Sequence, residues 1–144
     1  MIKGKMAETR FRLYTDGACR GNPGSGGIGA VFRDETGNIL GTLKRYIGNC
    51  TNNEAEYQAL IMGLEEAAKR GYGSLDIFMD SELVVNQLNG TYRVKNKNLL
   101  KYNLAARDLL STIGTYKVKH IDRSENKLAD QLANEAIDEH MNRY

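Results

Sequence analysis

The sequence predicts an α/β domain in which helices pack on a mixed five-stranded sheet. Three strand-like segments follow one another in the first third of the chain with short turns between them, which is typical of an antiparallel meander. Beyond residue 51, helical and strand patterns alternate, which is typical of parallel strands joined by helices. Because the chain has 144 residues, one proline and no repeat or low-complexity tract, we expect a single domain over residues 1–144.

The expected strands of the meander are runs of apolar or alternating residues at 10–15, 26–33 and 39–47. A helix is expected to begin at Asn52 or Asn53, which are good cap residues, and to stop at Gly71. The second half should then contain a strand at 75–79, helices at 82–88 and 98–110, a strand at 116–121 and a helix at about 126–140. Periodicity starts near Arg10, so the order of residues 1–8 stays open.

The composition indicates where in the cell the protein is located, the state of its cysteines and which partners its charge suggests. No apolar run approaches a membrane span and the first residues lack the apolar core of a signal peptide, so we expect a cytoplasmic protein without a membrane partner. Cys19 and Cys50 fit neither a disulfide framework nor a zinc motif and are interpreted as free thiols. The net charge of +2 does not by itself indicate a nucleic-acid binder. Lys95, Lys97 and Lys101, with Arg93 just before them, form a local basic cluster, which fits a solvated helix start at least as well as a nucleic-acid contact.

Four acidic residues stand where apolar residues or caps would be expected: Asp16, Glu56, Asp80 and Asp130. Asp16 and Asp80 close two expected core strands, and ligands commonly bind at the carboxyl ends of strands in open α/β sheets. Glu56 and Asp130 lie in the first turns of expected helices. Carboxylates that converge repel one another unless cations neutralise them, so the residues favour a divalent-metal site.

The position of each acid within its helix or strand distinguishes the candidate metal ligands from other acids nearby in the sequence. Glu56 shares a stripe with Ala59 and Gly63 at helical spacing and is expected to face inward. Glu54 points away and is interpreted as a first-turn carboxylate favoured by the helix dipole. Asp76 begins a strand and is expected to be exposed.

A glycine-rich motif and two histidines are each typical of a catalytic or phosphate-binding role, but their sequence context does not support that role. Residues 24–29 match a GxGxxG pattern, but a strand rather than a helix follows, so the glycines are interpreted as permitting a bent loop and a close strand crossing. Contact of this backbone with a substrate phosphate is the alternative. His120 and His140 have no serine or cysteine partner in a known motif. His120 fits a proton shuttle and a plain strand residue equally well.

Four segments, at residues 14–24, 51–57, 79–84 and 126–133, carry a resemblance to a known family: YTDGACRGNPG, TNNEAEY, MDSELV and NKLADQLA. In this order and spacing they resemble type 1 ribonuclease H over nearly the whole chain. The resemblance implies that family's ribonuclease H-like fold, a mixed sheet of strand order 3-2-1-4-5 with helices around it. It also places the family's catalytic, metal-binding acids on Asp16, Glu56, Asp80 and Asp130.

The resemblance implies hydrolysis of the RNA strand of an RNA/DNA hybrid, leaving a 5′-phosphate and a 3′-hydroxyl. Two Mg²⁺ or Mn²⁺ ions about 3.5–4 Å apart can activate water and stabilise the leaving oxygen in such reactions. By the family's pattern Asp16 bridges both ions, Glu56 and Asp80 help to hold one, and Asp130 holds the other. Glu56 is also suited to accept a hydrogen bond from a ribose hydroxyl, the group by which a protein distinguishes RNA from DNA.

The same resemblance implies six residues that contact the hybrid. Those lining the RNA minor groove are Cys19, Asn22, Asn52 and Asn53, and those forming a pocket for a DNA phosphate are Thr51 and Asn96. Some have a simpler structural role, since Asn22 can make the turn before Pro23 and Asn52 or Asn53 can cap a helix. The expected partner is the hybrid, bound by a monomer.

Two departures from the family leave questions open. The Trp-rich basic protrusion of some bacterial members is missing here, and the chain has no tryptophan, so affinity for the hybrid would either be weaker or depend on Arg93, Lys95 and Lys97. An ungapped match puts the family's mobile histidine at His120, whereas members with a shorter loop match residues 121–125 and would place Arg123 nearest the leaving group. The alternatives to a hybrid-cleaving enzyme are a related nuclease that prefers double-stranded RNA or DNA and a catalytically silent hybrid-binding module.

Overall fold

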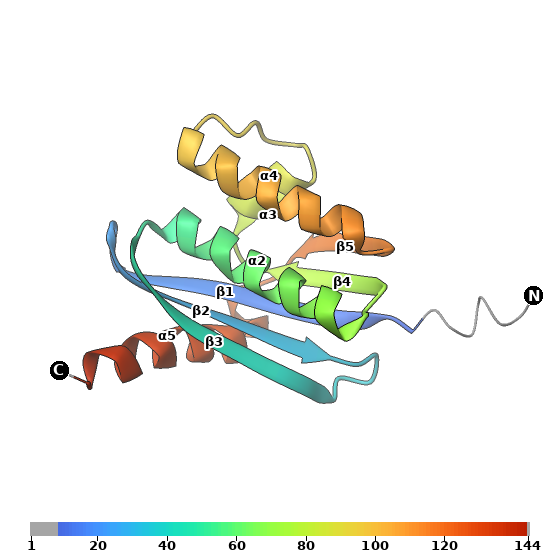
Figure 1. Ribbon diagram of the computed structural model, residues 1–144, viewed down its shortest axis with the longest axis horizontal. Helices are drawn as coiled ribbons and strands as arrows, with labels where there is room; N and C mark the ends of the chain where they lie inside the picture. The colour runs from blue at the N-terminus through green and yellow to red at the C-terminus, as the bar shows by residue number, and fades with distance from the viewer. Residues whose placement is uncertain (1–8, 144) are drawn as a thin grey trace, which may run out of the picture.

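The computed structural model describes residues 9–143, so residues 1–8, whose order the sequence left open, lie outside the described range. The sheet has the order β3-β2-β1-β4-β5, which confirms the predicted fold class. Its strands are β1 (Phe11–Gly21), β2 (Gly24–Arg33), β3 (Ile39–Cys50), β4 (Ser74–Met79) and β5 (Thr115–His120). The first three form an antiparallel meander, and β4 runs parallel to both β1 and β5. Helices cover both faces of the sheet (Figure 1).

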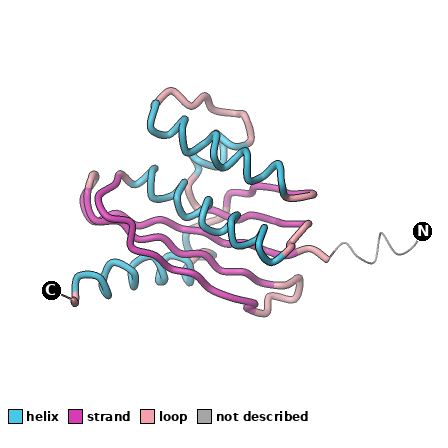
Figure 2. Tube along the Cα trace, in the orientation of Figure 1, coloured by secondary structure: helices cyan, strands magenta, loops and turns pink. Residues whose placement is uncertain are grey.

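The helices agree with the sequence prediction to within two residues at each end. They are α2 (Asn52–Arg70), α3 (Glu82–Leu88), α4 (Lys97–Thr112) and α5 (Lys127–Met141), with a 3-10 turn η1 (Arg123–Glu125) before the last. Helices α2, α3 and α4 lie on one face of the sheet and α5 lies on the other (Figure 2). The predicted stop at Gly71 is confirmed, because this residue caps α2 in the left-handed conformation at φ 73°. No helix within residues 9–143 is both long and apolar enough to cross a bilayer.

Strand β1 extends well beyond the predicted end at Thr15. Its parallel pairing with β4 stops at Thr15, but its antiparallel pairing with β2 continues to Gly21. The small and polar residues of this extension resemble a loop in sequence, and they form a strand because β2 supplies hydrogen-bond partners. Asp16 therefore lies inside β1, at the first position beyond the parallel part of the sheet.

The main core lies between the sheet and helices α2, α3 and α4. Fully buried side chains from β1, β4 and α2, including Leu13, Ile77 and Leu60, pack together there. The inward stripe predicted on α2 is confirmed, since Ala59 and Gly63 are buried. Among residues 9–143 the buried group contains one charged side chain, that of Asp16.

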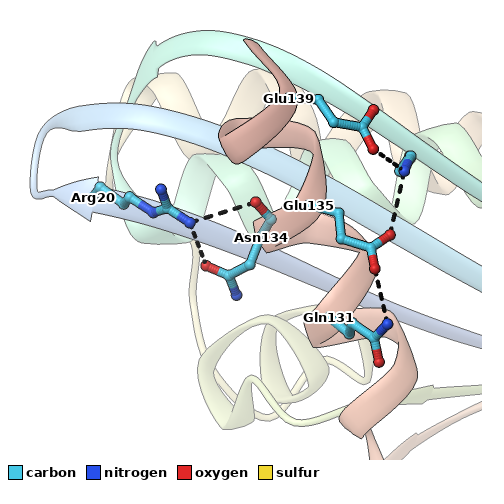
Figure 3. Close-up of polar contacts among 6 residues, drawn as sticks. Arg20, Gln131, Asn134, Glu135 and Glu139 are labelled. Atoms are coloured by element: carbon cyan, nitrogen blue, oxygen red, sulfur yellow. Dashed lines mark hydrogen bonds and ion pairs between the residues drawn. The ribbon is translucent and has the colours of Figure 1, made fainter. Parts of the chain in front are cut away.

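Helix α5 packs with its backbone directly on β2. A Cβ atom at Gly27 would collide with the carbonyl of Ala133, and one at Gly29 would collide with the carbonyl of Ala129. The glycines predicted to allow a close strand crossing therefore allow a close helix crossing instead. Polar contacts hold the helix in place: Arg20 on β1 donates to the side chain of Asn134 at 3.3 Å, and a lysine of β3 contacts two glutamates of α5 (Figure 3).

The expectation that Asp76 is exposed is wrong. Its side chain is 18% exposed and accepts a hydrogen bond from Arg10 Nε at 3.2 Å. Asp76 is the third residue of β4 and has β1 on one side and β5 on the other, so it cannot project freely from a strand end. The hydrogen bond from Arg10 lowers the pKa of the Asp76 carboxyl below its usual value.

Candidate active site

Three of the four predicted acids gather at one edge of the sheet. Carboxylate oxygens of Asp16, Glu56 and Asp80 lie within 4.8 Å of one another. Asp16 comes from β1 where the parallel pairing ends, Asp80 directly follows β4, and Glu56 lies in the first turns of α2. The capping role considered for Asp80 belongs to its neighbour Ser81, whose hydroxyl accepts the Val84 N–H at 3.3 Å. The Asp80 carboxylate is thus left to face the other two.

Glu56 is held in place by the backbone of β1. The N–H of Gly17 donates to Glu56 Oε1 at 2.9 Å. This contact requires α2 to approach β1 very closely, because a Cβ at Gly17 would collide with the backbone of Ala55 and Glu56. The sequence pattern did not single out Gly17, and its place directly after Asp16 was the available signal.

The fourth acid reaches the site from α5. Asp130 lies in the first turn of that helix, and its carboxylate is near enough to Asp16 to raise the pKa of the Asp16 carboxyl. Asn126, which precedes α5, is buried and donates from Nδ2 to the carbonyl of Thr15 at 2.9 Å. This hydrogen bond ties the start of α5 to the residue before Asp16. The sequence indicated Asn126 only as a helix boundary, so its positioning role was missed.

Burial and mutual repulsion make the acids hold their protons tightly. Burial is the largest cause that raises the pKa of Asp16, to about 10, and the Glu56 and Asp80 charges add to it. Burial, followed by the charge of Asp80, raises the pKa of Glu56 to about 8, although the Gly17 N–H and Arg123 oppose this. Without a cation, these two carboxyls therefore keep their protons near neutral pH, because the protein's own cationic side chains would balance their negative charge only in part. A divalent cation that takes the place of those protons suits such a site.

The raised pKa values predict how the metal-free protein responds to pH. A carboxyl whose pKa is raised on folding binds its proton more tightly in the folded state, so folding stability falls as pH rises from its unfolded pKa to its folded pKa. For Asp16 and Glu56 that window runs from about 4 to about 8–10. In EDTA we expect the free energy of unfolding, from urea titrations, to fall between pH 6 and pH 8.5.

Two comparisons check this pH dependence. Excess Mg²⁺ should flatten the profile, because cations replace protons as the neutralising partner. The double variant Asp16→Asn/Glu56→Gln should be equally flat in EDTA. A wild-type profile that is flat without metal would show that these carboxyls titrate normally and that repulsion between them is weak.

The structure places His120 and Arg123, the two residues that the sequence offered for the position nearest the leaving group, differently with respect to the acids. Arg123 in η1 lines an open hollow of about 380 Å³ together with Asp16, Glu56 and Asp80. His120 is the last residue of β5, is exposed, and is not among the residues that line this hollow. The geometry therefore agrees with the shorter-loop match, in which the histidine belongs to the strand.

A second hollow of about 260 Å³ lies beside the acidic one. It gathers four of the six predicted substrate contacts, namely Asn22, Thr51, Asn53 and Asn96. Thr51 caps α2, and its hydroxyl accepts the N–H of Glu54 at 3.2 Å. Asn96 caps α4 through its side-chain oxygen, which leaves its NH₂ group available as a donor. Capping thus leaves Thr51 and Asn96, which both line the hollow, with further hydrogen-bonding capacity.

The other two predicted contacts lie outside this second hollow. Asn52 lines the acidic hollow and is exposed, and its N–H donates to the side chain of Asn22 at 3.0 Å. Cys19 lies on β1 outside both hollows, with its thiol donating to the carbonyl of Cys50 at 2.8 Å. Neither Cys19 nor Cys50 is in a disulfide, which confirms that both are free thiols.

Comparisons with known proteins agree with this geometry. The ribonuclease HI of Halobacterium salinarum is 41% identical over 130 residues, which cover 90% of this chain and 65% of that protein. The ribonuclease H of Anaplasma marginale is 37% identical over 94% of this chain and 96% of that protein. The crystal structure of LC11-RNase H1 in complex with an RNA/DNA hybrid has a TM-score of 0.87 at 41% identity, over 91% of this chain and 99% of that one. Some longer curated relatives are matched over only 35% of their length.

The strand order and the acids at the carboxyl edge of β1 and β4 define the ribonuclease H-like class of α/β domains. A family model described as "Reverse transcriptase-like" matches residues 14–136. The chain belongs to the ribonuclease H family, as the four sequence segments predicted.

Proposed function

We propose that this protein is a metal-dependent endonuclease that hydrolyses the RNA strand of RNA/DNA hybrids. The observation that carries the proposal is the cluster of Asp16, Glu56 and Asp80, whose oxygens lie within 4.8 Å of one another in an open hollow. Relatives named ribonuclease H, aligned over most of the chain, support this activity. The related LC11-RNase H1 structure, which holds an RNA/DNA hybrid, supports the choice of substrate.

The donor set of the site fits Mg²⁺ or Mn²⁺. Carboxylate oxygens are the ligands that these hard cations prefer, and the cluster found within residues 9–143 consists of carboxylates alone. We propose that two ions bind, with Asp16 shared between them, Glu56 and Asp80 on one side and Asp130 on the other. When bound, such ions lower the pKa of a coordinated water and stabilise charge on the oxygens of the scissile phosphate.

The chain's own residues would position the reactants. Gly17 fixes the Glu56 carboxylate through its N–H, and Asn126 fixes the start of the helix that carries Asp130. Arg123 faces the same hollow and offers a permanent positive charge to the phosphate. Hydrolysis with departure of the 3′-oxygen would leave a 5′-phosphate and a 3′-hydroxyl.

The second hollow would bind the DNA strand. Thr51 and Asn96 present polar groups to it, and the asparagine NH₂ can donate to a phosphate oxygen. Asn22 and Asn52 connect the two hollows through their hydrogen bond of 3.0 Å. They are placed for contacts with the groove between the two strands, where the RNA 2′-hydroxyl is read.

Cleavage of an end-labelled RNA/DNA hybrid tests the proposal. Matched RNA/RNA and DNA/DNA duplexes are compared in Mg²⁺, in Mn²⁺ and in EDTA, and the product ends are identified by phosphatase sensitivity. We expect metal-dependent loss of the RNA strand from the hybrid alone, with a phosphate on the new 5′ end. Cleavage of double-stranded RNA would instead identify a related nuclease, and binding of the hybrid without cleavage would identify a silent binding module.

Replacing Arg123 should affect catalysis much more than replacing His120. Loss of one electrostatic contact to a developing charge costs about 100-fold in rate, so we expect Arg123→Ala to slow single-turnover cleavage by roughly ten- to hundredfold. Arg123→Lys should restore part of the rate, because the charge returns without the planar fork. His120→Ala should stay within about threefold of wild type, as for an exposed residue away from the chemistry.

Measurement of the free energy of unfolding controls the Arg123 experiment. Arg123 is exposed, so Arg123→Ala should leave folding stability within about 0.5 kcal/mol of wild type. If His120→Ala were the slower variant, the longer-loop match would be correct and the histidine would reach the site by a movement of the strand end.

A further inference from the structure

Helix α5 covers only part of its face of the sheet. It packs against β1, β2 and β3, whereas no helix of the described chain covers β4 and β5 on this side (Figure 1). Side chains that alternate along the strands project from the uncovered region. We name this region, together with the neighbouring positions of β1 and β2, the basic sheet face. Its residues are Arg10, Arg12, Tyr14, Arg33, Phe78, Lys117 and Lys119.

Strand register arranges the cations of this face in a row across the sheet. Arg12 on β1 is paired with Arg33 on β2 and with Asp76 on β4, and Asp76 is paired with Lys117 on β5. Asp76 is the carboxylate within the row, and the hydrogen bond from Arg10 neutralises it. The row therefore keeps a positive charge, although Glu35 and Glu125 border the face.

The next row toward the active site is aromatic. Tyr14 and Phe78 are paired in register, and their rings stack with centroids 4.8 Å apart and planes 19° apart. Arg33 lies over the Tyr14 ring at 5.8 Å and Lys119 lies over the Phe78 ring at 5.9 Å. Both rings are half-buried, so part of each remains open to a ligand.

The third row is the candidate active site itself. Asp16 lies two residues after Tyr14 on β1 and therefore projects from the same face of the sheet, roughly 7 Å farther along the strand. Cations, aromatic rings and the acidic cluster thus follow one another along the strands, with η1 at the boundary between the last two: Glu125 lies beside Tyr14, and Arg123 lines the acidic hollow. A polyanion that leaves the active site in this direction passes η1 and then meets the aromatic rings and the cations.

We propose that the basic sheet face binds a single-stranded nucleic-acid segment that continues from the hybrid held in the active site. This inference rests on the proposed function. Proteins that bind single strands without sequence preference combine cations that follow the backbone with aromatic rings on which bases stack, and the face offers both. A duplex is less suited, because its bases are already stacked and cannot reach rings set in the floor of a sheet.

Neither edge protection nor an acidic protein partner accounts for the whole face. Lysines on an edge strand discourage pairing with another sheet, and this role would explain Lys117 and Lys119 on β5. It would not explain Arg12 and Arg33, because β1 and β2 are interior strands. An acidic protein segment would satisfy the cations but would give the aromatic rings of the face no role.

Binding of hybrids with and without single-stranded extensions tests this inference. Equal hybrids are prepared blunt, with an RNA overhang and with a DNA overhang at each end, and fluorescence anisotropy is measured with the Asp16→Asn protein to prevent turnover. We expect an overhang at one end to tighten Kd by about three- to tenfold, with a steeper dependence on salt. Lys117→Glu/Lys119→Glu should remove this gain and leave the Kd of the blunt hybrid within about twofold.

A charge-matched control distinguishes binding at the basic sheet face from attraction by the net charge of the whole protein. Arg45→Glu/Lys69→Glu makes the same change in net charge, at an exposed position of β3 and an exposed position at the end of α2. This variant should keep the overhang preference. Equal loss of preference in both double variants would overturn the inference, because only net charge would then matter.

A spectroscopic probe tests the aromatic row directly. The chain has no tryptophan, so Phe78→Trp introduces a single indole whose emission reports on stacking. An overhang should quench this emission and a blunt hybrid should not. Quenching by polyglutamate in place of nucleic acid would overturn the inference in favour of an acidic protein partner. Overhangs that bind no more tightly than blunt ends would also overturn it. Binding of single strands with no binding of any hybrid would contradict the proposed function while supporting this surface.

Discussion

Replacing Asp16 with asparagine is expected to abolish hydrolysis and, in metal-free buffer, to make the fold more stable. The substitution removes the charge shared by both proposed ions at nearly constant shape. Metal ions supply several kcal/mol of transition-state stabilisation, so the single-turnover rate should fall by about a thousandfold or more. The stability gain follows from the 4% exposure of Asp16 and from a pKa raised to about 10, because an uncharged side chain avoids both burial of charge and repulsion.

The stability effect distinguishes a metal site from a structural carboxylate. We expect Asp16→Asn to raise the free energy of unfolding in EDTA at pH 8 by on the order of 1 kcal/mol, or about 2–4 °C in Tm. Saturating Mg²⁺ should reverse the order, because only the wild type gains binding energy from the ions. Asp76→Asn is the matched control: it removes a carboxyl paired with Arg10 and should weaken the fold slightly in either buffer. Near-wild-type turnover in Asp16→Asn would rule out the metal assignment.

Adding one methyl group at Gly17 is expected to damage both the fold and the active site. The new Cβ would overlap the backbone of Ala55 and Glu56, and backbone atoms of a packed helix cannot move aside as a side-chain tip can. We expect Gly17→Ala to lower the free energy of unfolding by about 1–3 kcal/mol. The displaced helix would also carry the Glu56 carboxylate away from its partners, and a misplacement of about 1 Å can cost about 100-fold in rate.

Gly73→Ala is the control for the Gly17 experiment. A Cβ at Gly73 meets no atom within 4 Å, so the same substitution should leave stability unchanged or raise it slightly. Urea unfolding and single-turnover cleavage of an RNA/DNA hybrid are measured on both variants. A Gly17→Ala protein as stable as wild type would show that α2 does not need its close approach to β1.

Most of the fold and the acidic centre could be predicted because their signals are local. Periodicity and cap residues placed the helices to within two residues, as at Gly71, since capping depends on neighbours in sequence. At the start of α2 the cap is Thr51, one residue before the predicted Asn52. The convergence of Asp16, Glu56 and Asp80 could be predicted because Asp16 and Asp80 directly follow the paired parallel stretches of β1 and β4, and Glu56 lies near the start of α2.

The features that the sequence did not predict depend on tertiary partners. The extension of β1 exists because β2 pairs with it, and Asp76 is half-buried because two strands flank it. Gly17 and Asn126 act through contacts with Ala55 and Thr15, each distant in the chain. The sequence marks such residues only as a glycine or a boundary, so their positioning roles became visible in three dimensions.

The late position of α5 has a consequence for the protein during synthesis. The chain segments bearing Asp16, Glu56 and Asp80 leave the ribosome well before the segment bearing Asp130, and Asn126 ties that last helix to β1. A nascent chain lacking α5 would expose the glycines of β2 and would hold an incomplete acidic centre. The proposed activity should therefore require that α5 has been translated and has docked on β1 and β2.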